Sequence, residues 1–174
     1  MKLEFQFEDS VFVISNFLSK DMYESLHATI MKNNEQIDED VKKTWDPDLI
    51  GNYKPVYKKI LDPNVVGPYS ILLRSQTFVK LIDKDINFIA HKMPFGSGIQ
   101  WHDDRTCAVA ATLYLNKNWN DNWGGELMWK HNGSGGFIPV QGNTLVLMKP
   151  PVYHKVNPVL SKNIARYSIQ SFIT

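Results

Sequence analysis

The chain contains a single cysteine, Cys107, among 174 residues, so no disulfide can form within it. Such scarcity suits a reducing compartment, and we expect a cytoplasmic protein. Long hydrophobic runs are also lacking, because none approaches the roughly 20 residues that a membrane-spanning helix requires. The opening residues, MKLEFQFEDS, have no apolar segment of the kind found in signal peptides. The sequence therefore predicts no association with a membrane.

The net charge of the chain is close to zero. The 19 basic and 18 acidic residues leave a formal charge of +1, which provides no general attraction to nucleic acid. A polypeptide or a small molecule is therefore a better expected partner than a nucleic acid. A length of 174 residues with 43% hydrophobic composition predicts one domain, residues 1–174, with a core of its own.

The amino-terminal part carries helical signals. A short strand is expected at 11–14, and Ser19 can then cap a helix at 20–33, because its hydroxyl can accept from free backbone amides. The periodic spacing of apolar residues gives this helix one buried face. That face is formed by Met22, Leu26 and Ile30.

The segment that follows is less regular. Residues 36–67 are polar and contain three prolines, so we expect irregular structure there, with a short helix near 57–61. A second helix is expected at 69–83.

From residue 86 onward, short segments rich in β-branched and aromatic residues alternate with clusters of Gly, Asn and Pro. Several short strands separated by turns are typical of a sandwich or jelly roll, not of parallel βα units. We predict an α+β fold, in which helices within 1–85 support a double-stranded β-helix (jelly roll) at 86–174. The expected strands lie at 86–93, 107–116, 125–130, 136–140, 143–148 and 165–173.

A His-x-Asp triplet is the first candidate functional motif. Successive side chains of a strand point to opposite faces, so His102 and Asp104 point the same way while Asp103 points away. His154 lies on a distant strand that a jelly roll could bring close. Two histidines and one carboxylate can cover one face of an octahedral iron and leave the opposite face open. The triplet alone is a weak signal, because it often occurs by chance.

Arg166 is the second candidate. Side chains alternate along a strand, so Arg166, Ser168 and Gln170 share one face. That face can point into a polar barrel interior. A buried guanidinium needs an anion. That anion can be a bound carboxylate, which the planar fork of arginine matches. The alternatives are a salt bridge to Glu126 or a position on the surface.

Longer stretches of the carboxy-terminal half form a more specific pattern. They are GSGIQWHDD, ATLYLNKNWNDNWGGELMW, PVQGNTLVLM and HKVNPVLSKNIARYSIQSF. Through them the chain resembles the prolyl 4-hydroxylase-like 2-oxoglutarate/Fe(II)-dependent dioxygenases, especially the intracellular oxygen-sensing and ribosomal prolyl hydroxylases. The resemblance covers residues 86–173 and is loose before that segment.

The resemblance implies both cofactors and residue roles. It places Arg166 and the hydroxyl of Tyr114 on the C5 carboxylate of 2-oxoglutarate, with Leu127 against the methylenes. The implied reaction uses O2, releases succinate and CO2, and hydroxylates a prolyl residue of a peptide or protein, with ascorbate as a candidate reductant. The implied catalytic ligands of Fe(II) are His102, Asp104 and His154.

Some positions leave alternatives open. Many relatives carry a tyrosine on the strand before the triplet, where this chain has His91. Trp101 and Trp129 either line a substrate mouth or pack in the core, and a mouth near Trp101 and the 117–124 loop is expected.

Three other functions compete with prolyl hydroxylation. The same chemistry could act on another side chain or a free amino acid. A nucleic-acid demethylase is disfavoured, because such enzymes tend to carry a second arginine six residues after the cosubstrate arginine, where this chain has Phe172. A non-catalytic metal-binding jelly roll would need no open iron face.

Overall fold

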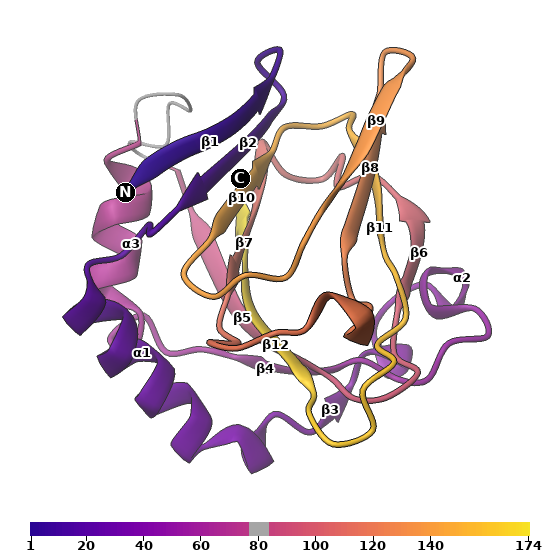
Figure 1. Cartoon of the computed structure of the whole chain (residues 1–174), viewed down its shortest axis with the longest axis horizontal. Helices are drawn as coiled ribbons and strands as arrows, with labels where there is room; N and C mark the ends of the chain where they lie inside the picture. The colour runs from indigo at the N-terminus through magenta and orange to yellow at the C-terminus, as the bar shows by residue number, and fades with distance from the viewer. Residues whose placement is uncertain (77–83) are drawn as a thin grey trace.

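Two antiparallel sheets face each other in the computed structural model, which describes residues 1–76 and 84–174 (Figure 1). The larger sheet has eight strands in the order β1 (Lys2–Phe7), β2 (Val11–Ser15), β10 (Leu145–Met148), β7 (Val109–Tyr114), β12 (Arg166–Ile173), β5 (Ile86–Met93), β4 (Tyr57–Ile60) and β3 (Glu39–Asp40). The smaller sheet has four, in the order β6 (Ile99–His102), β11 (Tyr153–Val156), β8 (Leu127–His131) and β9 (Ser134–Ile138). This architecture confirms the predicted α+β double-stranded β-helix.

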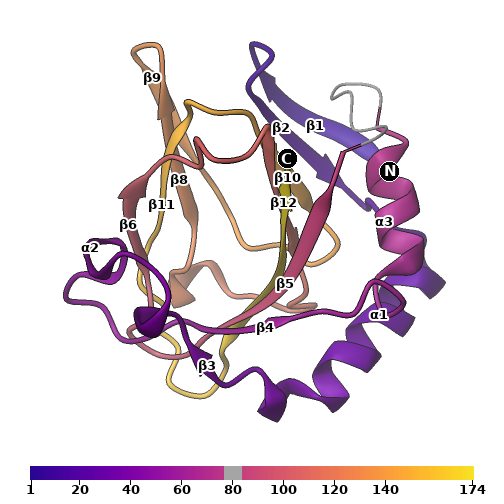
Figure 2. The same ribbon diagram turned by 180° about the vertical axis from the view of Figure 1, so that it is seen from behind.

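Helices cover only the larger sheet. In both views α1 (Lys20–Lys32) and α3 (Gly67–Arg74) lie on its outer side, whereas the short α2 (Pro47–Ile50) lies beside β6 (Figures 1 and 2). None of the helices in the described part of the chain is long and apolar enough to cross a membrane. The remaining turns of helix are of the 3-10 type: η1 (Asn34–Gln36), η2 (Val41–Lys43) and η3 (Asp121–Trp123).

The larger sheet has two different faces because side chains alternate along its strands. On β7, Leu113 belongs to the core shared with the helices, whereas the next residue, Tyr114, belongs to the core between the sheets. On β12, Ile169 faces the helices, whereas Arg166 and Ser168 line a pocket between the sheets. One face therefore anchors the helices and the other presents polar side chains to the interior.

Helix α1 matches its prediction closely. The Ser19 hydroxyl accepts a hydrogen bond from the Met22 amide at 3.3 Å, as expected of an N-cap. Tyr23, Leu26 and Ile30 are buried against the larger sheet. The Tyr23 hydroxyl also donates to the Leu115 carbonyl at 2.8 Å, which fixes the helix to the end of β7.

The helix predicted near 57–61 is wrong. This segment is strand β4, which pairs with β5 through the register Tyr57 to Lys92. Pairing with a distant strand overrides local propensity here. The second predicted helix is α3, which starts at Gly67 rather than 69 and ends at Arg74. Residues 75 and 76 are not helical, and the rest of the prediction, 77–83, lies outside the described residues.

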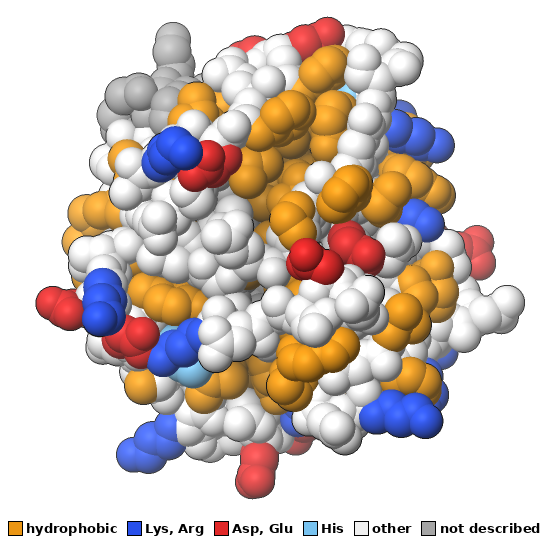
Figure 3. All heavy atoms as spheres, in the orientation of Figure 1, with side chains coloured by type: hydrophobic (Ala, Val, Ile, Leu, Met, Phe, Trp, Pro, Cys, Tyr) orange, Lys and Arg blue, Asp and Glu red, His pale blue; other side chains and the backbone are white. Residues whose placement is uncertain are grey.

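Strand β1 was not predicted, although the strict alternation of polar and apolar residues in KLEFQF is a strand signal. Its apolar residues turn toward β8: the ring of Phe7 lies 4.9 Å from that of Trp129, and the ring of Phe5 lies 5.9 Å away. Figure 3 shows the resulting apolar surface between the β1–β2 hairpin and the β8–β9 hairpin. The amino-terminal segment thus contributes strands as well as helices.

Asn143 joins the amino-terminal segment to the jelly roll. It has a positive φ of 60°, and its side chain both accepts from the Leu18 amide at 2.8 Å and donates to the Leu18 carbonyl at 2.9 Å. All four atoms are buried, so losing the amide leaves two unsatisfied backbone groups.

We expect Asn143→Ala to lower the free energy of unfolding by about 3 kcal/mol, from lost hydrogen bonds and from a strained left-handed backbone. Asn143→Gly relieves the strain and should cost about 1 kcal/mol less. Urea unfolding of both variants measures the difference. A glycine variant as stable as the parent protein would show that the Leu18 hydrogen bonds contribute nothing.

Candidate active site

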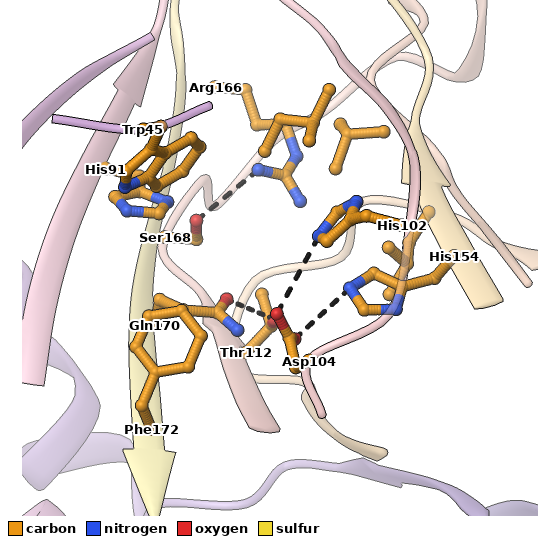
Figure 4. A pocket seen from close by; sticks show the side chains of 13 residues that line it. Trp45, His91, His102, Asp104, Thr112, His154, Arg166, Ser168, Gln170 and Phe172 are labelled. Carbon is orange, nitrogen blue, oxygen red and sulfur yellow. Dashed lines mark hydrogen bonds and ion pairs between the residues drawn. The ribbon is translucent and has the colours of Figure 1, made fainter. Parts of the chain in front are cut away.

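Strand pairing brings the two histidines of the predicted metal motif together. Strands β6 and β11 are antiparallel neighbours, and His154 lies directly opposite His102. Asp104 follows the end of β6. The three potential ligand atoms lie within 4.8 Å of one another, inside a pocket between the sheets (Figure 4). This is the only group of its kind among the residues that the structure describes.

Both imidazole rings are oriented by their own strands. The Nδ1 atom of His102 lies 2.8 Å from the Gln100 carbonyl, and that of His154 lies 3.1 Å from the Val152 carbonyl. These contacts suit a proton on Nδ1, which leaves the lone pair of Nε2 free for a metal. The Nε2 atoms lie 3.8 and 3.4 Å from the two carboxylate oxygens of Asp104.

The neighbouring aspartate has a different environment. Asp103 accepts a hydrogen bond from Nε of the exposed Arg105 at 2.7 Å. Asp104 instead has a buried oxygen, Oδ2, that makes no hydrogen bond. Asp104, and not Asp103, therefore lies with the two histidines, and a cation between Asp104 and the histidines would satisfy the buried oxygen.

Electrostatics of the group favour metal binding. Burial lowers the pKa of His102, and the charge of His154 lowers it further. Burial raises the pKa of Asp104, but the nearby histidines, His154 first and then His102 and His91, together outweigh burial, so that the pKa is lowered on balance. A neutral imidazole and an ionised carboxylate are the forms that bind a divalent cation.

Arg166 occupies the opposite part of the pocket without an acidic partner. It is only 2% exposed, and among the described residues no carboxylate pairs with it, so the alternative of a salt bridge to Glu126 is wrong. Its Nη1 atom lies 3.2 Å from the Met93 sulfur and 3.4 Å from the Ser168 hydroxyl. A buried guanidinium in such neutral surroundings fits an anionic ligand.

Further unpaired donors surround this guanidinium. On three neighbouring strands, Ser168 of β12 lies directly opposite His91 of β5 on one side and Tyr114 of β7 on the other. The Arg166 guanidinium lies 4.9 Å from the centre of the Tyr114 ring. The Tyr114 hydroxyl, the His91 Nε2 and the Arg166 Nε are all buried and lack a partner. A carboxylate would satisfy such a group, so these residues fit 2-oxoglutarate beside the metal.

Two of these donors are held neutral. Burial raises the pKa of Tyr114, although the charge of Arg166 opposes the rise. Burial lowers the pKa of His91 to about 3, and the charge of Arg166 lowers it further. Both side chains can therefore donate a hydrogen bond without adding charge to the pocket.

The site also contains residues that the sequence did not reveal. Trp45, from the segment expected to be irregular, packs its ring 5.4 Å from that of His91 (Figure 4). Thr112 donates to Gln170 at 2.6 Å beside the metal group. Leu127 lines the same pocket, as the resemblance implied for it. Local periodicity has no signal for Trp45, because its position depends on a loop.

The expected substrate mouth needs correction. No residue of the 117–124 loop lines the pocket. That loop lies at the Arg166 end, where a Cβ on Gly125 (φ 77°) would come within 3.0 Å of Arg166 and 3.5 Å of Trp119. Trp129 is buried, whereas Trp101 is 38% exposed on the outer side of β6. Of the two tryptophans, only Trp101 is available to a partner.

Comparison with solved structures places this fold among known enzymes. A prolyl-4-hydroxylase from Pseudomonas putida has 20% identity and a TM-score of 0.74, covering 94% of this chain and 91% of its own. A Trichoplax adhaerens prolyl hydroxylase, solved with a hypoxia inducible factor peptide, has 16% identity and a TM-score of 0.77, covering 95% and 83%. A viral collagen prolyl hydroxylase from Paramecium Bursaria Chlorella virus-1, in complex with 2OG, has 15% identity and a TM-score of 0.66, covering 94% and 95%.

Sequence comparison gives the family. No curated protein matches the chain. The family model of the 2OG-Fe(II) oxygenase superfamily matches residues 88–174, which include every metal and cosubstrate residue proposed above. The chain therefore belongs to the 2OG-Fe(II) oxygenase superfamily and is a 2-oxoglutarate-dependent dioxygenase that uses Fe(II), 2-oxoglutarate and O2.

Proposed function

We propose that this dioxygenase hydroxylates a prolyl residue of a peptide or protein and releases succinate and CO2. One observation carries the oxygenase part: a single pocket joins the His102, Asp104 and His154 group to the buried, acid-free Arg166. Two neutral side chains and one carboxylate leave part of a metal's coordination sphere open, as an oxygenase requires and a structural metal site does not.

Each residue has a separate task in this proposal. His102 and His154 bind Fe(II) through Nε2, and the carbonyls of Gln100 and Val152 keep their rings in that orientation. Arg166 and Tyr114 bind the C5 carboxylate of 2-oxoglutarate, and Leu127 contacts its methylenes. The bound iron supplies the activation of O2, and the chain supplies binding, orientation and exclusion of water.

The prolyl substrate is supported by relatives in structure. The three structures described above are named prolyl hydroxylases, and one of them holds a peptide. The chain also carries the YLNKNW and GGEL segments on which its resemblance to this branch rests. A single cysteine, Cys107, which is buried, suits the cytoplasm, which we propose as the compartment.

Mass spectrometry tests the substrate assignment. A library of proline-containing peptides is incubated with the enzyme, Fe(II), ascorbate and 2-oxoglutarate, and we expect a gain of one oxygen on proline. Asp104→Ala serves as the matched inactive control. Oxygen found only on other residues, free amino acids or nucleobases would exclude the prolyl substrate and leave the oxygenase assignment intact.

Tyr114→Phe should weaken 2-oxoglutarate binding about fivefold to tenfold, because it removes one hydrogen bond from a neutral donor, worth about 1 kcal/mol. Folding should be retained, since the hydroxyl has no partner within the protein. Calorimetry with Mn(II) in place of iron measures the affinity. An unchanged affinity would show that Tyr114 only packs against Arg166.

A further inference from the structure

The outer face of the four-stranded sheet presents exposed aromatic and basic side chains, and its strands contain no acidic residue. Neither Asp nor Glu occurs in the four strands β6, β11, β8 and β9. Side chains that point away from the pocket on these strands include Trp101, Tyr153 and Phe137, which are 38%, 39% and 66% exposed. In Figure 3, hydrophobic and basic side chains alternate along the edge of the molecule over β6 and β11.

Two lysines on this face lie over aromatic rings. The Lys130 ammonium is 4.6 Å from the centre of the Trp101 ring and 5.6 Å from that of Tyr153. The Lys155 ammonium is 5.6 Å from the Trp101 ring. Neither lysine pairs with a carboxylate among the described residues. Both positive charges are therefore held in place and available to an external anion.

Two carboxylates near the outer face, those of Asp103 and Glu8, are already engaged. Asp103 bonds to Arg105 at 2.7 Å. Glu8 accepts from Asn132 at 2.9 Å and lies 3.8 Å from His131, at the tip of the β8–β9 hairpin. The positive charge of the outer face is thus local, although the whole chain has a formal charge of only +1.

Two aromatic residues of the outer face directly precede proposed metal ligands along the chain. Trp101 directly precedes His102, and Tyr153 directly precedes His154, so each aromatic residue lies on the reverse side of a proposed metal ligand. A surface pocket of about 530 Å³ is lined in part by Arg105, Lys130 and Tyr153, beside the β8–β9 hairpin.

We propose that this outer face binds an acidic segment of the polypeptide substrate, a few residues away from the residue presented to the metal site. The proposal rests on the proposed function, because it assumes that the substrate is a polypeptide. Carboxylates would pair with Lys130 and Lys155, and apolar atoms of the segment would pack on Trp101. A nucleic acid fits less well, because two free lysines provide few phosphate contacts.

Fluorescence anisotropy tests the surface with two labelled peptides. Each carries one proline, followed after a short spacer by a run of glutamates in one peptide and of glutamines in the other. The protein is loaded with Mn(II) and 2-oxoglutarate. Lys130→Gln/Lys155→Gln removes the two charges, and Lys20→Gln/Lys42→Gln makes the same charge change at two exposed positions elsewhere.

We expect the glutamate peptide to bind more tightly than the glutamine peptide to the parent protein. Exposed ion pairs are individually weak, so Lys130→Gln/Lys155→Gln should raise its Kd about fivefold to tenfold at low salt. The control variant and the glutamine peptide should show no such change. The proposal would be overturned if both double variants lost the same affinity for the glutamate peptide, or if neither lost any. It would also be overturned if a labelled oligouridylate bound more tightly than the glutamate peptide through the same lysines.

The same variants and peptides, with Fe(II) and O2 supplied for the oxidation assay, separate this proposal from the proposed function. Calorimetric binding of 2-oxoglutarate should be equal in both lysine variants and the parent protein. Lysine-dependent binding of the glutamate peptide without oxidation of any proline would support the surface and count against prolyl hydroxylation. Oxidation of proline at equal rates in both peptides, unaffected by the lysine substitutions, would exclude the surface and leave the proposed function standing.

Discussion

Asp104→Ala is expected to abolish turnover and metal binding, whereas Asp103→Ala should keep most of both. The two residues are adjacent, so the pair forms its own control. Asp104 places its carboxylate 3.8 and 3.4 Å from the two Nε2 atoms, and Asp103 bonds outward to Arg105. Losing one of three protein ligands removes a charged contact that water replaces poorly.

Succinate production and Mn(II) calorimetry check this expectation. His102→Ala and His154→Ala should behave like Asp104→Ala, because each removes one imidazole ligand. An inactive Asp103→Ala together with an active Asp104→Ala would reverse the assignment of the carboxylate ligand.

Arg166→Ala should raise the dissociation constant of 2-oxoglutarate by a factor corresponding to about 2–5 kcal/mol, as for the loss of one partner of a buried charge pair. The dissociation constant of Arg166→Lys should lie between those of the parent protein and Arg166→Ala, since lysine keeps the charge and loses the planar fork. Calorimetry with Mn(II) in place of iron gives both values. Unchanged binding in Arg166→Ala would contradict the carboxylate clamp.

Substitution of Arg166 should weaken cosubstrate binding but should not lower the free energy of unfolding of the protein without cosubstrate. In the absence of cosubstrate, Arg166 is a buried cation without an anion, which destabilises the fold. We therefore expect Arg166→Met to be at least as stable as the parent protein in urea unfolding without 2-oxoglutarate. Mn(II) alone should stabilise both proteins, because the metal group is unchanged, but adding 2-oxoglutarate to the Mn(II)-loaded proteins should stabilise the parent protein far more than Arg166→Met.

Strand β12 and helix α1 could be predicted from the sequence, because each is indicated by the spacing of residues within its own segment. The alternation of Arg166, Ser168 and Gln170 predicted one polar face of β12, and these residues do line one pocket. The Ser19 cap and the apolar spacing predicted α1 to within one residue of its end. The family resemblance supplied the roles of these positions, which no spacing alone reveals.

Contacts between distant segments could not be predicted in the same way. The register that sets His154 opposite His102 depends on the pairing of β11 with β6, and strand β4 exists because β5 pairs with it. Trp45 reaches His91 from a loop, and Lys130 and Lys155 meet at Trp101 only after three strands have assembled. Tertiary pairing of this kind overrides local propensity.

Anaerobic titration of 2-oxoglutarate, with and without Fe(II), tests most directly whether metal and cosubstrate share one pocket. The parent protein should bind one equivalent tightly with Fe(II) and far more weakly without it, because the ligand contacts both the metal and Arg166. Asp104→Ala should lose the effect of the metal, and Arg166→Ala should weaken binding in both conditions. Equal affinity with and without Fe(II), in a protein shown to bind the metal, would contradict a shared site.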